Sequence, residues 1–512
     1  MQAPELRKGL KSMDLGFPRV SVLLRVPVIF LSVFSTALHA DVVLPAIFSN
    51  HMVLQQGVTL PVWGWAAPGE RVIVTVAERC EETIADSRGY WRVTLRPLAK
   101  STDTTALVIN GKNRLEITDV IIGDVWICAG EGNMDFPLSS ATTGKEEHDM
   151  LRDRYLRFFI ASKQRSAGME KVGSGHWIVC SPEDAPQFSA VGYFFARDIR
   201  SAQHIPVGMI QCTAENAPAQ SWISRRGLEY PPSILPRQSG WATHEEQSRV
   251  GAGSPSSIFN GMITPLIPYA ITGAIWYQGE SQVGENALQY RRLLPRLITD
   301  MRQHWEQGPF PFYFVSLAGF GGVQDAVVEN YRGHDGQPLH GLPWIREGEA
   351  CALMLPNTGM ASASDLGDPE TRQPEDKLDV GRRLALLARH RVYGEDLVDS
   401  GPVFQGMKIE GNKVRILFGS VGGGLVLGIP PWHPEGESVQ LVPSLYGFAI
   451  RGEDRKWHRA DALIEGDVVI LSSSSVRSPE AVRYGWKGMP DGNLYNKEGL
   501  PAVPFRTDSD QP

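Results

Sequence analysis

The chain has 512 residues, of which 42% are hydrophobic and 21% are charged, and its formal net charge is -7. This length predicts roughly two to four domains, and the composition excludes a disordered chain because it supplies enough apolar residues for real cores. The negative net charge argues against a nucleic-acid partner.

The first 40 residues have the pattern of an export signal. Basic residues come first, the apolar segment "VPVIFLSVF" (26–34) follows, and small residues permit cleavage after Ala37 or Ala40. An uncleaved anchor is the alternative, but the apolar segment is shorter than the about 20 residues that span a bilayer. We therefore expect a signal peptide over 1–40 and a soluble mature protein in the periplasm or outside the cell, without membrane contact.

The five cysteines show neither a CxxC pair nor a Cys/His ligand spacing. This spacing argues against a zinc site. We also predict no other metal and no cofactor. One disulfide is possible, but the sequence does not choose a pairing, and buried thiols are the simpler interpretation. The cysteines are Cys80, Cys128, Cys180, Cys212 and Cys351.

Three regions follow the signal segment. Residues 41–118 alternate apolar and polar positions between turns such as "APGE" and "NGKN", which predicts a small β-sandwich. Residues 119–395 alternate strand-like runs with amphipathic helices, which predicts an α/β domain with a parallel sheet and helices on both faces. A Gly/Pro/Ser-rich stretch within it predicts a loop insertion over about 223–257, and the β pattern returns over 396–512.

Four Gly-containing segments each follow a strand-like run of the central region. Because the carboxyl ends of parallel strands meet at one edge of a sheet, we expect all four segments to open onto one crevice. An ordinary strand-helix turn explains any one of them, whereas four together favour a pocket. The segments are "ICAGEGNM" (127–134), "QCTAENAP" (211–218), "WYQGESQ" (276–282) and "SDLGDPETRQP" (364–374).

Longer stretches between about Val43 and Asp508 resemble the sialate O-acetylesterase family, a branch of the SGNH hydrolases. The resemblance implies a flavodoxin-like, three-layer SGNH core of α/β class with N-terminal and C-terminal β-sandwich-type domains. It also implies an exported enzyme that removes acetyl esters from sialic acids or other carbohydrates. The stretches are "VLPAIFSNHMVLQQ", "PVWGWAAPGE", "FNGMITPLIPYAITGAIWYQGES", "GDPE…K…DVGRRLAL" and "NLYNKEGLPAVPFRTD".

The catalytic motifs of that family are altered in this sequence. The nucleophile of its Gly-Gln-Ser-Asn-Met motif is replaced by Gly132, which offers no hydroxyl for an acyl-enzyme. Its Asp-x-His pair becomes Thr371 and Gln373, which supply neither a charge to orient an imidazolium nor a titrating base. No catalytic residue is intact, and losing the triad leaves a rate of roughly 10³–10⁴ over water.

The oxyanion-hole positions also differ from the family pattern. Glu215 and Asn216 stand where the family has Trp-Gly-Gly-Thr-Pro, and Gln282 replaces the Asn of Gln-Gly-Glu-Ser-Asn. Negative charge on Glu131 and Glu215 near a developing oxyanion opposes the transition state. We therefore expect a protein that is inactive or very weakly active.

Other groups could replace the lost chemistry only in unorthodox ways. Ser281 lies on a different segment and has no His beside it in the sequence, although a distant His could pair with it in space. A pair of carboxylates could act as acid and base on a glycosidic bond, but solvated or structural roles are the simpler interpretation. These carboxylates are Glu131, Glu215, Glu280 and Glu370.

Three hypotheses remain from the sequence. We favour an impaired esterase that keeps a glycan-binding crevice, with Trp222 acting either as a stacking platform or as a core residue. The second is an active carbohydrate O-acetylesterase that uses substituted groups, and the third is an interaction module with a vestigial crevice. The candidate contacts of the first are Asn133, Trp222, Gln278 and Glu280.

Overall fold

The computed structural model describes residues 41–142, 151–229, 251, 253–283, 287–321, 341–428 and 444–509. The chain divides into two compact units, 1–40 and 41–512, and all described residues belong to the second. The predicted signal peptide therefore lies outside the described residues. Among the described helices, none has the length and hydrophobicity needed to cross a membrane.

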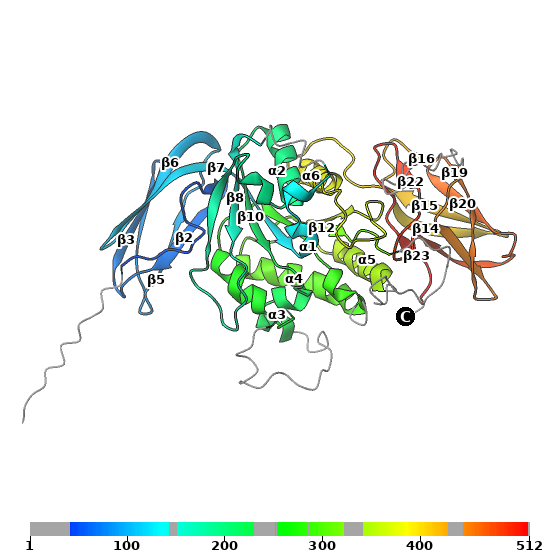
Figure 1. Ribbon diagram of the computed structural model, residues 1–512, viewed down its shortest axis with the longest axis horizontal. Coiled ribbons are helices and arrows are strands. Elements are labelled where there is room, and N and C mark those ends of the chain that lie inside the picture. Colours follow the sequence, from blue (N-terminus) through cyan, green and yellow to red (C-terminus); the bar gives the residue numbers. More distant parts are fainter. Residues whose placement is uncertain are drawn as a thin grey trace, which may run out of the picture. The chain divides into compact units, whose positions relative to one another are not determined.

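Strands β1 to β6 form the N-terminal region (Figure 1). Strands β2 and β5 form an antiparallel pair, and β3 pairs with both β4 and β6. Buried and partly exposed residues alternate along β3 and β5, because one face of each strand packs on the core. The strands are β1 (Val53–Gln55), β2 (Leu60–Trp65), β3 (Arg71–Val76), β4 (Arg79–Ile84), β5 (Tyr90–Leu95) and β6 (Ser101–Asn110).

One long strand, β7 (Arg114–Gly130), belongs to both the N-terminal and the central region. Its first part pairs antiparallel with β6, and its second part pairs in parallel with β10 and β11. The boundary predicted between residues 118 and 119 therefore lies within a strand. Every residue of β7 from Val120 onward is buried, as expected of a strand that is covered on both faces.

The central strands run in the order β13-β12-β11-β7-β10-β8-β9. All neighbours are parallel except β8 and β9, so the α/β class predicted from the sequence is confirmed as a mixed sheet. The chain places β10 on one side of β7 and β11 on the other, so the strand order reverses at β7. The bounds are β8 (Asp153–Ala161), β9 (Gly175–Cys180), β10 (Val207–Thr213), β11 (Gly273–Tyr277), β12 (Phe312–Ser316) and β13 (Thr358–Ser362).

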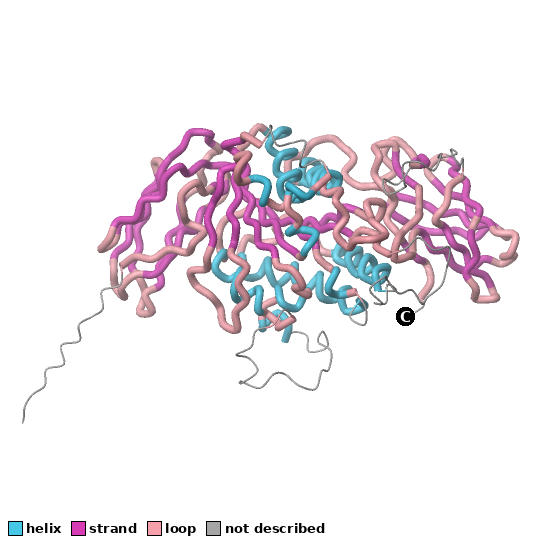
Figure 2. The backbone as a smooth tube through the Cα atoms, in the orientation of Figure 1, coloured by secondary structure: helices cyan, strands magenta, loops and turns pink. Residues whose placement is uncertain are grey.

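Helices α2 and α6 lie on one side of the central strands, and α4 and α5 lie on the other (Figures 1 and 2). Helix α2 begins where the Ser189 hydroxyl accepts the Gly192 N–H at 3.0 Å, a typical N-cap. Within the predicted loop insertion, α3 is described and residues 230–250 are not. The helices are α1 (Gly132–Asp135), α2 (Ala190–Gln203), α3 (Arg225–Glu229), α4 (Tyr290–Trp305), α5 (Gly341–Cys351) and α6 (Leu378–Arg391).

Antiparallel strands follow α6. Two four-stranded sheets, β14-β15-β20-β19 and β18-β17-β21-β23, accompany the pair β16-β22 and bury a core of their own. The strands are β14 (Val403–Glu410), β15 (Lys413–Gly419), β16 (Leu425–Leu427), β17 (Phe448–Gly452), β18 (Trp457–Arg459), β19 (Asp461–Glu465), β20 (Val468–Ser472), β21 (Pro479–Tyr484), β22 (Leu494–Asn496) and β23 (Phe505–Arg506).

All five cysteines are free in the described structure. Cys128, Cys180 and Cys212 are buried, whereas Cys80 is exposed and Cys351 is half-buried. Burial raises the pKa of the Cys128 thiol to about 12, which keeps it protonated and inert.

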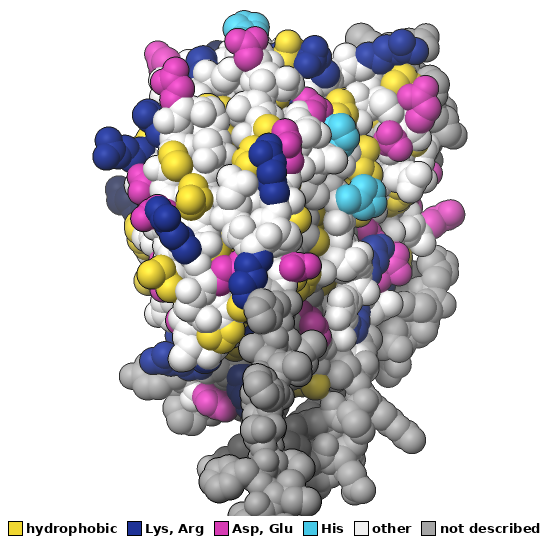
Figure 3. Space-filling model, turned by 90° about the vertical axis from the view of Figure 1, so that its left-hand side faces the viewer, with side chains coloured by type: hydrophobic (Ala, Val, Ile, Leu, Met, Phe, Trp, Pro, Cys, Tyr) yellow, Lys and Arg dark blue, Asp and Glu magenta, His cyan; other side chains and the backbone are white. Residues whose placement is uncertain are grey.

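On the face shown in Figure 3, Lys and Arg side chains are interspersed with Asp and Glu, so neither sign of charge dominates it.

Candidate functional site

The four segments predicted to share a crevice meet around Glu131, at the end of β7. The Glu131 carboxylate accepts the backbone N–H of Ala217, which follows β10, and the side-chain amide of Gln278, which follows β11. The fourth segment, which follows β13, brings Gln373 against Gly132. The four segments therefore meet at the position where the strand order reverses, the usual ligand site of such sheets. We call this meeting point, together with the small pocket beside it, the crevice.

The turn that ends β7 is held by backbone contacts with both neighbouring strands. Gly130 has φ 143°, and a Cβ there would lie 2.0 Å from the Tyr277 carbonyl oxygen, so only glycine fits. The Glu131 N–H donates to that same carbonyl at 2.9 Å, and the Ala214 N–H donates to the Gly130 carbonyl at 3.0 Å. These bonds set the position at which Gly132 begins α1.

The three positions that the resemblance assigns to the triad are brought together. A Cβ added to Gly132 would lie 2.0 Å from Nε2 of Gln373, so the glutamine amide fills the space that a side chain at 132 would enter. The Gln373 N–H donates to Oγ1 of Thr371 at 3.1 Å, and the Thr371 N–H donates to Oδ1 of Asp368 at 3.2 Å. Positions 132, 371 and 373 thus lie close together, but there is no hydroxyl at 132 and no titrating group at 373.

Glu131 links the segments from a buried position, with 2% of its surface exposed. Its Oε1 accepts the Ala217 N–H at 2.9 Å, and its Oε2 accepts the Gln278 amide at 2.9 Å and the Ser281 N–H at 3.2 Å. Burial, and secondarily the charge of Glu280, raise the pKa of Glu131 to about 8, against the hydrogen bonds from Ser281 and Gln278. Its described contacts are all with protein groups, so it positions the crevice rather than lining it.

Asn133 lies at the centre of a second polar cluster. Its side-chain amide donates to Oε1 of Glu280 and to the Arg372 carbonyl, the latter at 2.9 Å. Its Oδ1 accepts from Nζ of Lys377 at 2.7 Å, and that ammonium lies 4.8 Å from the centre of the Phe136 ring. Burial lowers the pKa of Lys377 to about 7, although Glu280 and Asp376 oppose the shift.

Sequence reasoning did not select Lys377 as a site residue. It is fully buried, and it reaches Asn133 from the start of α6, 244 positions along the chain. The sequence gives only a weak signal, a lysine inside the "GDPE…K…DVGRRLAL" stretch.

A small pocket opens beside this cluster. Arg372 lies against it with its guanidinium 5.1 Å from the centre of the Phe320 ring. Within the described structure, Oε2 of Glu280 is buried and has no hydrogen-bond partner. The pocket thus combines an apolar wall with one unpaired acceptor. Its lining residues are Asn133, Glu280, Val283, Leu317, Ala318, Phe320, Leu342 and Arg372.

Two candidate contacts lie in the core instead of the pocket. Trp222 is fully buried, packs edge-on against Trp276 with ring centres 5.1 Å apart, and donates to the Ala217 carbonyl at 3.1 Å. Of its two suggested roles the stacking platform is wrong, because neither ring face is open to a ligand. Gln278 is also fully buried, and it joins Glu131 to the hydroxyl of Tyr290.

The positions expected at the oxyanion hole are divided between surface and interior. Glu215 and Asn216 are exposed, and the carbonyl of Glu215 accepts from Arg165 at 2.7 Å. Gln282 is buried, with 1% of its surface exposed. Ser281 is exposed, and none of the hydrogen bonds of the described histidines involves it. A hydroxyl–imidazole pair at Ser281 is therefore missing from the described structure.

The wall of the pocket after β12 is fixed by Arg346 of α5, a residue that the sequence did not single out. Arg346 is buried and donates to the carbonyls of Leu317 and Ala318 at 2.7 and 3.0 Å. It also donates to the carbonyls of Lys487 and Gly488 in the C-terminal region at 2.7 and 2.9 Å. One guanidinium therefore joins the pocket wall to the loop after β21.

Comparison with known proteins agrees with the resemblance seen in the sequence. Residues 123–368 match the family described as carbohydrate esterase, sialic acid-specific acetylesterase. The sialate O-acetylesterases of Rattus norvegicus and Homo sapiens are each 27% identical, over 416 and 402 residues that cover 69% and 71% of this chain and 74% of each relative. The crystal structure of a carbohydrate acetylesterase from Xanthomonas citri is 33% identical, with a TM-score of 0.79, over 91% of this chain and 100% of that chain. The chain therefore belongs to the sialic acid-specific acetylesterase family of carbohydrate esterases.

Proposed function

We propose that this protein binds acetylated carbohydrate in the crevice at the ends of β7, β10, β11 and β13, and that it hydrolyses acetyl esters very weakly or not at all. The observation that carries this proposal is the contact at position 132. A Cβ added to Gly132 would lie 2.0 Å from the Gln373 amide nitrogen, so the amide fills the space of a side chain at 132. Because glycine has no hydroxyl and glutamine does not titrate, both the nucleophile and the general base are missing. Ester hydrolysis through a covalent intermediate needs both groups.

The retained polar groups support a binding role. Oε2 of Glu280 is a buried acceptor without a protein partner in the described structure, and leaving such a group unsatisfied costs about 1–3 kcal/mol. A sugar hydroxyl that donates to it removes that cost. The apolar wall formed by Leu317, Phe320 and Leu342 suits the methyl group of an acetyl ester.

We further infer that the central region is a flavodoxin-like SGNH core. The order β10-β7-β11-β12-β13 corresponds to the 2-1-3-4-5 order of flavodoxin-like sheets, with β8 and β9 added beyond β10. Helices on both sides of this sheet agree with a three-layer arrangement (Figure 1). Experimental coordinates that place β10 or β11 elsewhere than beside β7 would contradict this inference.

Export is also a proposal. The basic leader, the apolar segment and the small residues before Asp41 support removal of residues 1–40. N-terminal sequencing of protein from the periplasm or medium is expected to begin at residue 38 or 41, after Ala37 or Ala40. Full-length protein retained in the membrane fraction would show an anchor instead.

Glycan binding tests the proposed function, with Glu280→Gln as the informative variant. This substitution turns the unpaired acceptor into a donor, so binding to acetylated glycans on an array is expected to fall about tenfold. Glu410→Gln is the matched control, because Glu410 is exposed on β14. Absence of glycan binding in the wild type would favour the interaction module, and equal binding by all three proteins would place the glycan outside the crevice.

A further inference from the structure

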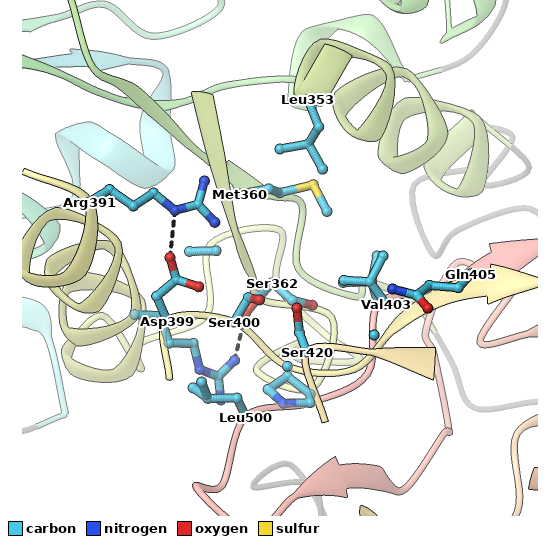
Figure 4. A pocket seen from close by; sticks show the side chains of 16 residues that line it. Leu353, Met360, Ser362, Arg391, Asp399, Ser400, Val403, Gln405, Ser420 and Leu500 are labelled. Atoms are coloured by element: carbon cyan, nitrogen blue, oxygen red, sulfur yellow. Dashed lines mark hydrogen bonds and ion pairs between the residues drawn. The ribbon is translucent and has the colours of Figure 1, made fainter. Parts of the chain in front are cut away.

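A second cavity lies between the central and C-terminal regions, where β13 and α6 face the strands β14 and β15 (Figure 4). We call it the seam cavity. Its volume is about 250 Å³, room for roughly eight waters at about 30 Å³ each. It shares no lining residue with the pocket beside Glu280, so it is a separate site.

An ion pair with spare hydrogen-bonding capacity stands at one end of the seam cavity. Nε of Arg391 donates to Oδ2 of Asp399, and Nη1 donates to the Thr358 carbonyl at 2.7 Å. Within the described residues, Nη2 of Arg391 and Oδ1 of Asp399 have no hydrogen-bond partner. The pair therefore offers the N–H groups of Nη2 as donors and one carboxylate oxygen as an acceptor to a ligand.

Gln405 stands at the opposite end, on a β-bulge of β14 (Figure 4). In the pairing of β14 with β15, Phe404 and Gly406 have partners and Gln405 between them has none. Bulges of this kind often redirect a side chain beside a functional site. A Cβ at Gly419 would lie 2.2 Å from Nε2 of Gln405, so the glycine makes room for the amide. No described residue hydrogen-bonds to that amide, which leaves it free to donate and accept.

Two serines between these ends are fixed by one buried side chain. Asn496 is fully buried, and its amide donates to the carbonyls of Ser400 and Ser420 at 3.1 and 3.5 Å. Ser420 has φ 54°, an uncommon backbone conformation for a residue other than glycine. The hydroxyls of both serines have no partner within the described residues, and apolar side chains such as Met360 and Leu500 complete the lining.

The charges of the seam cavity balance. Arg391 is paired with Asp399, and Arg383 is paired with Asp365 at 2.6 and 2.8 Å. A charged ligand therefore finds no opposite net charge, whereas an uncharged molecule with several hydroxyls finds donors, acceptors and apolar walls. We propose that the seam cavity is a second binding site, for one uncharged sugar ring. This proposal does not depend on the function of the crevice.

Titration of the full-length protein with methyl glucoside and methyl galactoside, followed by ligand-observed NMR, tests the proposal. Saturable binding of at least one glycoside at millimolar concentrations is expected, with weaker binding of N-acetylneuraminic acid and of inorganic phosphate. Gln405→Ala removes one amide and is expected to weaken the glycoside about five- to tenfold. Lys413→Ala is the control, because Lys413 is exposed on neighbouring β15.

Two further variants locate the site. Asp399→Asn leaves the charge of Arg391 unpaired, so the affinity ratio of N-acetylneuraminic acid to methyl glucoside is expected to rise. Glu280→Gln alters the crevice and no residue that lines the seam cavity, so glycoside binding in the seam cavity is expected to survive it. Binding that Glu280→Gln abolishes and Gln405→Ala leaves intact would overturn the proposal, as would the absence of saturable binding in a wild type with normal thermal unfolding.

Discussion

The proposed loss of catalysis is argued from the contact between Gly132 and Gln373. The sequence shows that both residues depart from the family motif, but it does not show that one occupies the space of the other. Because the amide is the end of a flexible side chain, it can move aside when a larger residue enters position 132. The two positions are therefore expected to be energetically coupled.

Gly132→Ser alone is expected to lower the stability by about 0.5–1 kcal/mol, below the usual cost of overpacking, because the new side chain displaces an amide at the end of an exposed, flexible side chain. Gly132→Ser combined with Gln373→Ala is expected to recover most of that loss. Denaturant unfolding of both single variants and the double variant measures the coupling. Equal and additive losses would show that the two side chains do not compete for one space.

The pH dependence of stability tests the buried carboxyl of Glu131. Burial raises its pKa in the folded protein from 4.5 to about 8. Folding therefore binds a proton, and the contribution of Glu131 is complete below about pH 4.5 and declines as the pH rises through about 8. Lys377 has the opposite effect, since its contribution is lost as the pH falls through about 7, and the window from about pH 5 to 7 therefore avoids its titration. Burial also raises the pKa of Glu349, Asp198 and Asp376, so Glu131 is assigned by comparing the wild type with Glu131→Gln.

In that window the wild type is expected to lose about 1–2 kcal/mol of unfolding free energy that Glu131→Gln does not lose. Glu370→Gln serves as the control, because Glu370 is exposed. Denaturant unfolding at the two pH values gives the comparison. A parallel decline in the wild type and Glu131→Gln would assign the proton uptake to another group.

At the scale of elements, helix α5 supports the pocket through Arg346. Its guanidinium satisfies four carbonyls, two in the pocket wall and two after β21. Arg346→Met leaves these acceptors unpaired and Glu349 buried without its cation, so a loss of about 3–5 kcal/mol is expected. Arg382→Ala on α6 is the exposed control, and a loss below about 1 kcal/mol for Arg346→Met in urea unfolding would contradict the role.

The sequence predicted which segments form strands and helices better than it predicted where the regions end or which residues pack together. The apolar runs at 155–161 and 207–212 predicted buried strands, and both are strands of the central sheet. The sequence could not show that one strand crosses the predicted boundary at 118/119. Strand β7 changes its pairing partners there, but its own residues continue as one strand. Trp222 could not be placed either, since only tertiary packing distinguishes a buried indole from a surface platform.

At the scale of the whole molecule, the central region depends on the C-terminal strands. The Asp365 carboxylate pairs with Arg383 and also accepts the hydroxyl of Tyr495 at 3.1 Å. Arg506 stacks 4.3 Å from the centre of the Trp344 ring and pairs with Glu347 of α5. These buried contacts explain why residues 41–512 form one compact unit.

A chain of residues 41–395 is therefore expected to be insoluble or to unfold at much lower temperature than a chain of 41–512. The shorter chain loses two of the four carbonyl partners of Arg346 and the hydroxyl that donates to Asp365. Calorimetry and near-UV circular dichroism compare the two. A soluble 41–395 chain with the same transition temperature would show that the C-terminal strands are dispensable.

Hydrolysis of a chromogenic acetyl ester tests the central claim, the loss of catalysis at Gly132, Thr371 and Gln373, most directly. The purified wild type is expected to match the buffer rate, whereas the triple variant Gly132→Ser, Thr371→Asp, Gln373→His is expected to turn over the ester. Asn133→Leu, purified in parallel and checked for the thermal unfolding of the wild type, identifies any contaminating hydrolase because Asn133 lines the pocket. Saturable hydrolysis by the wild type that Asn133→Leu abolishes would contradict the account.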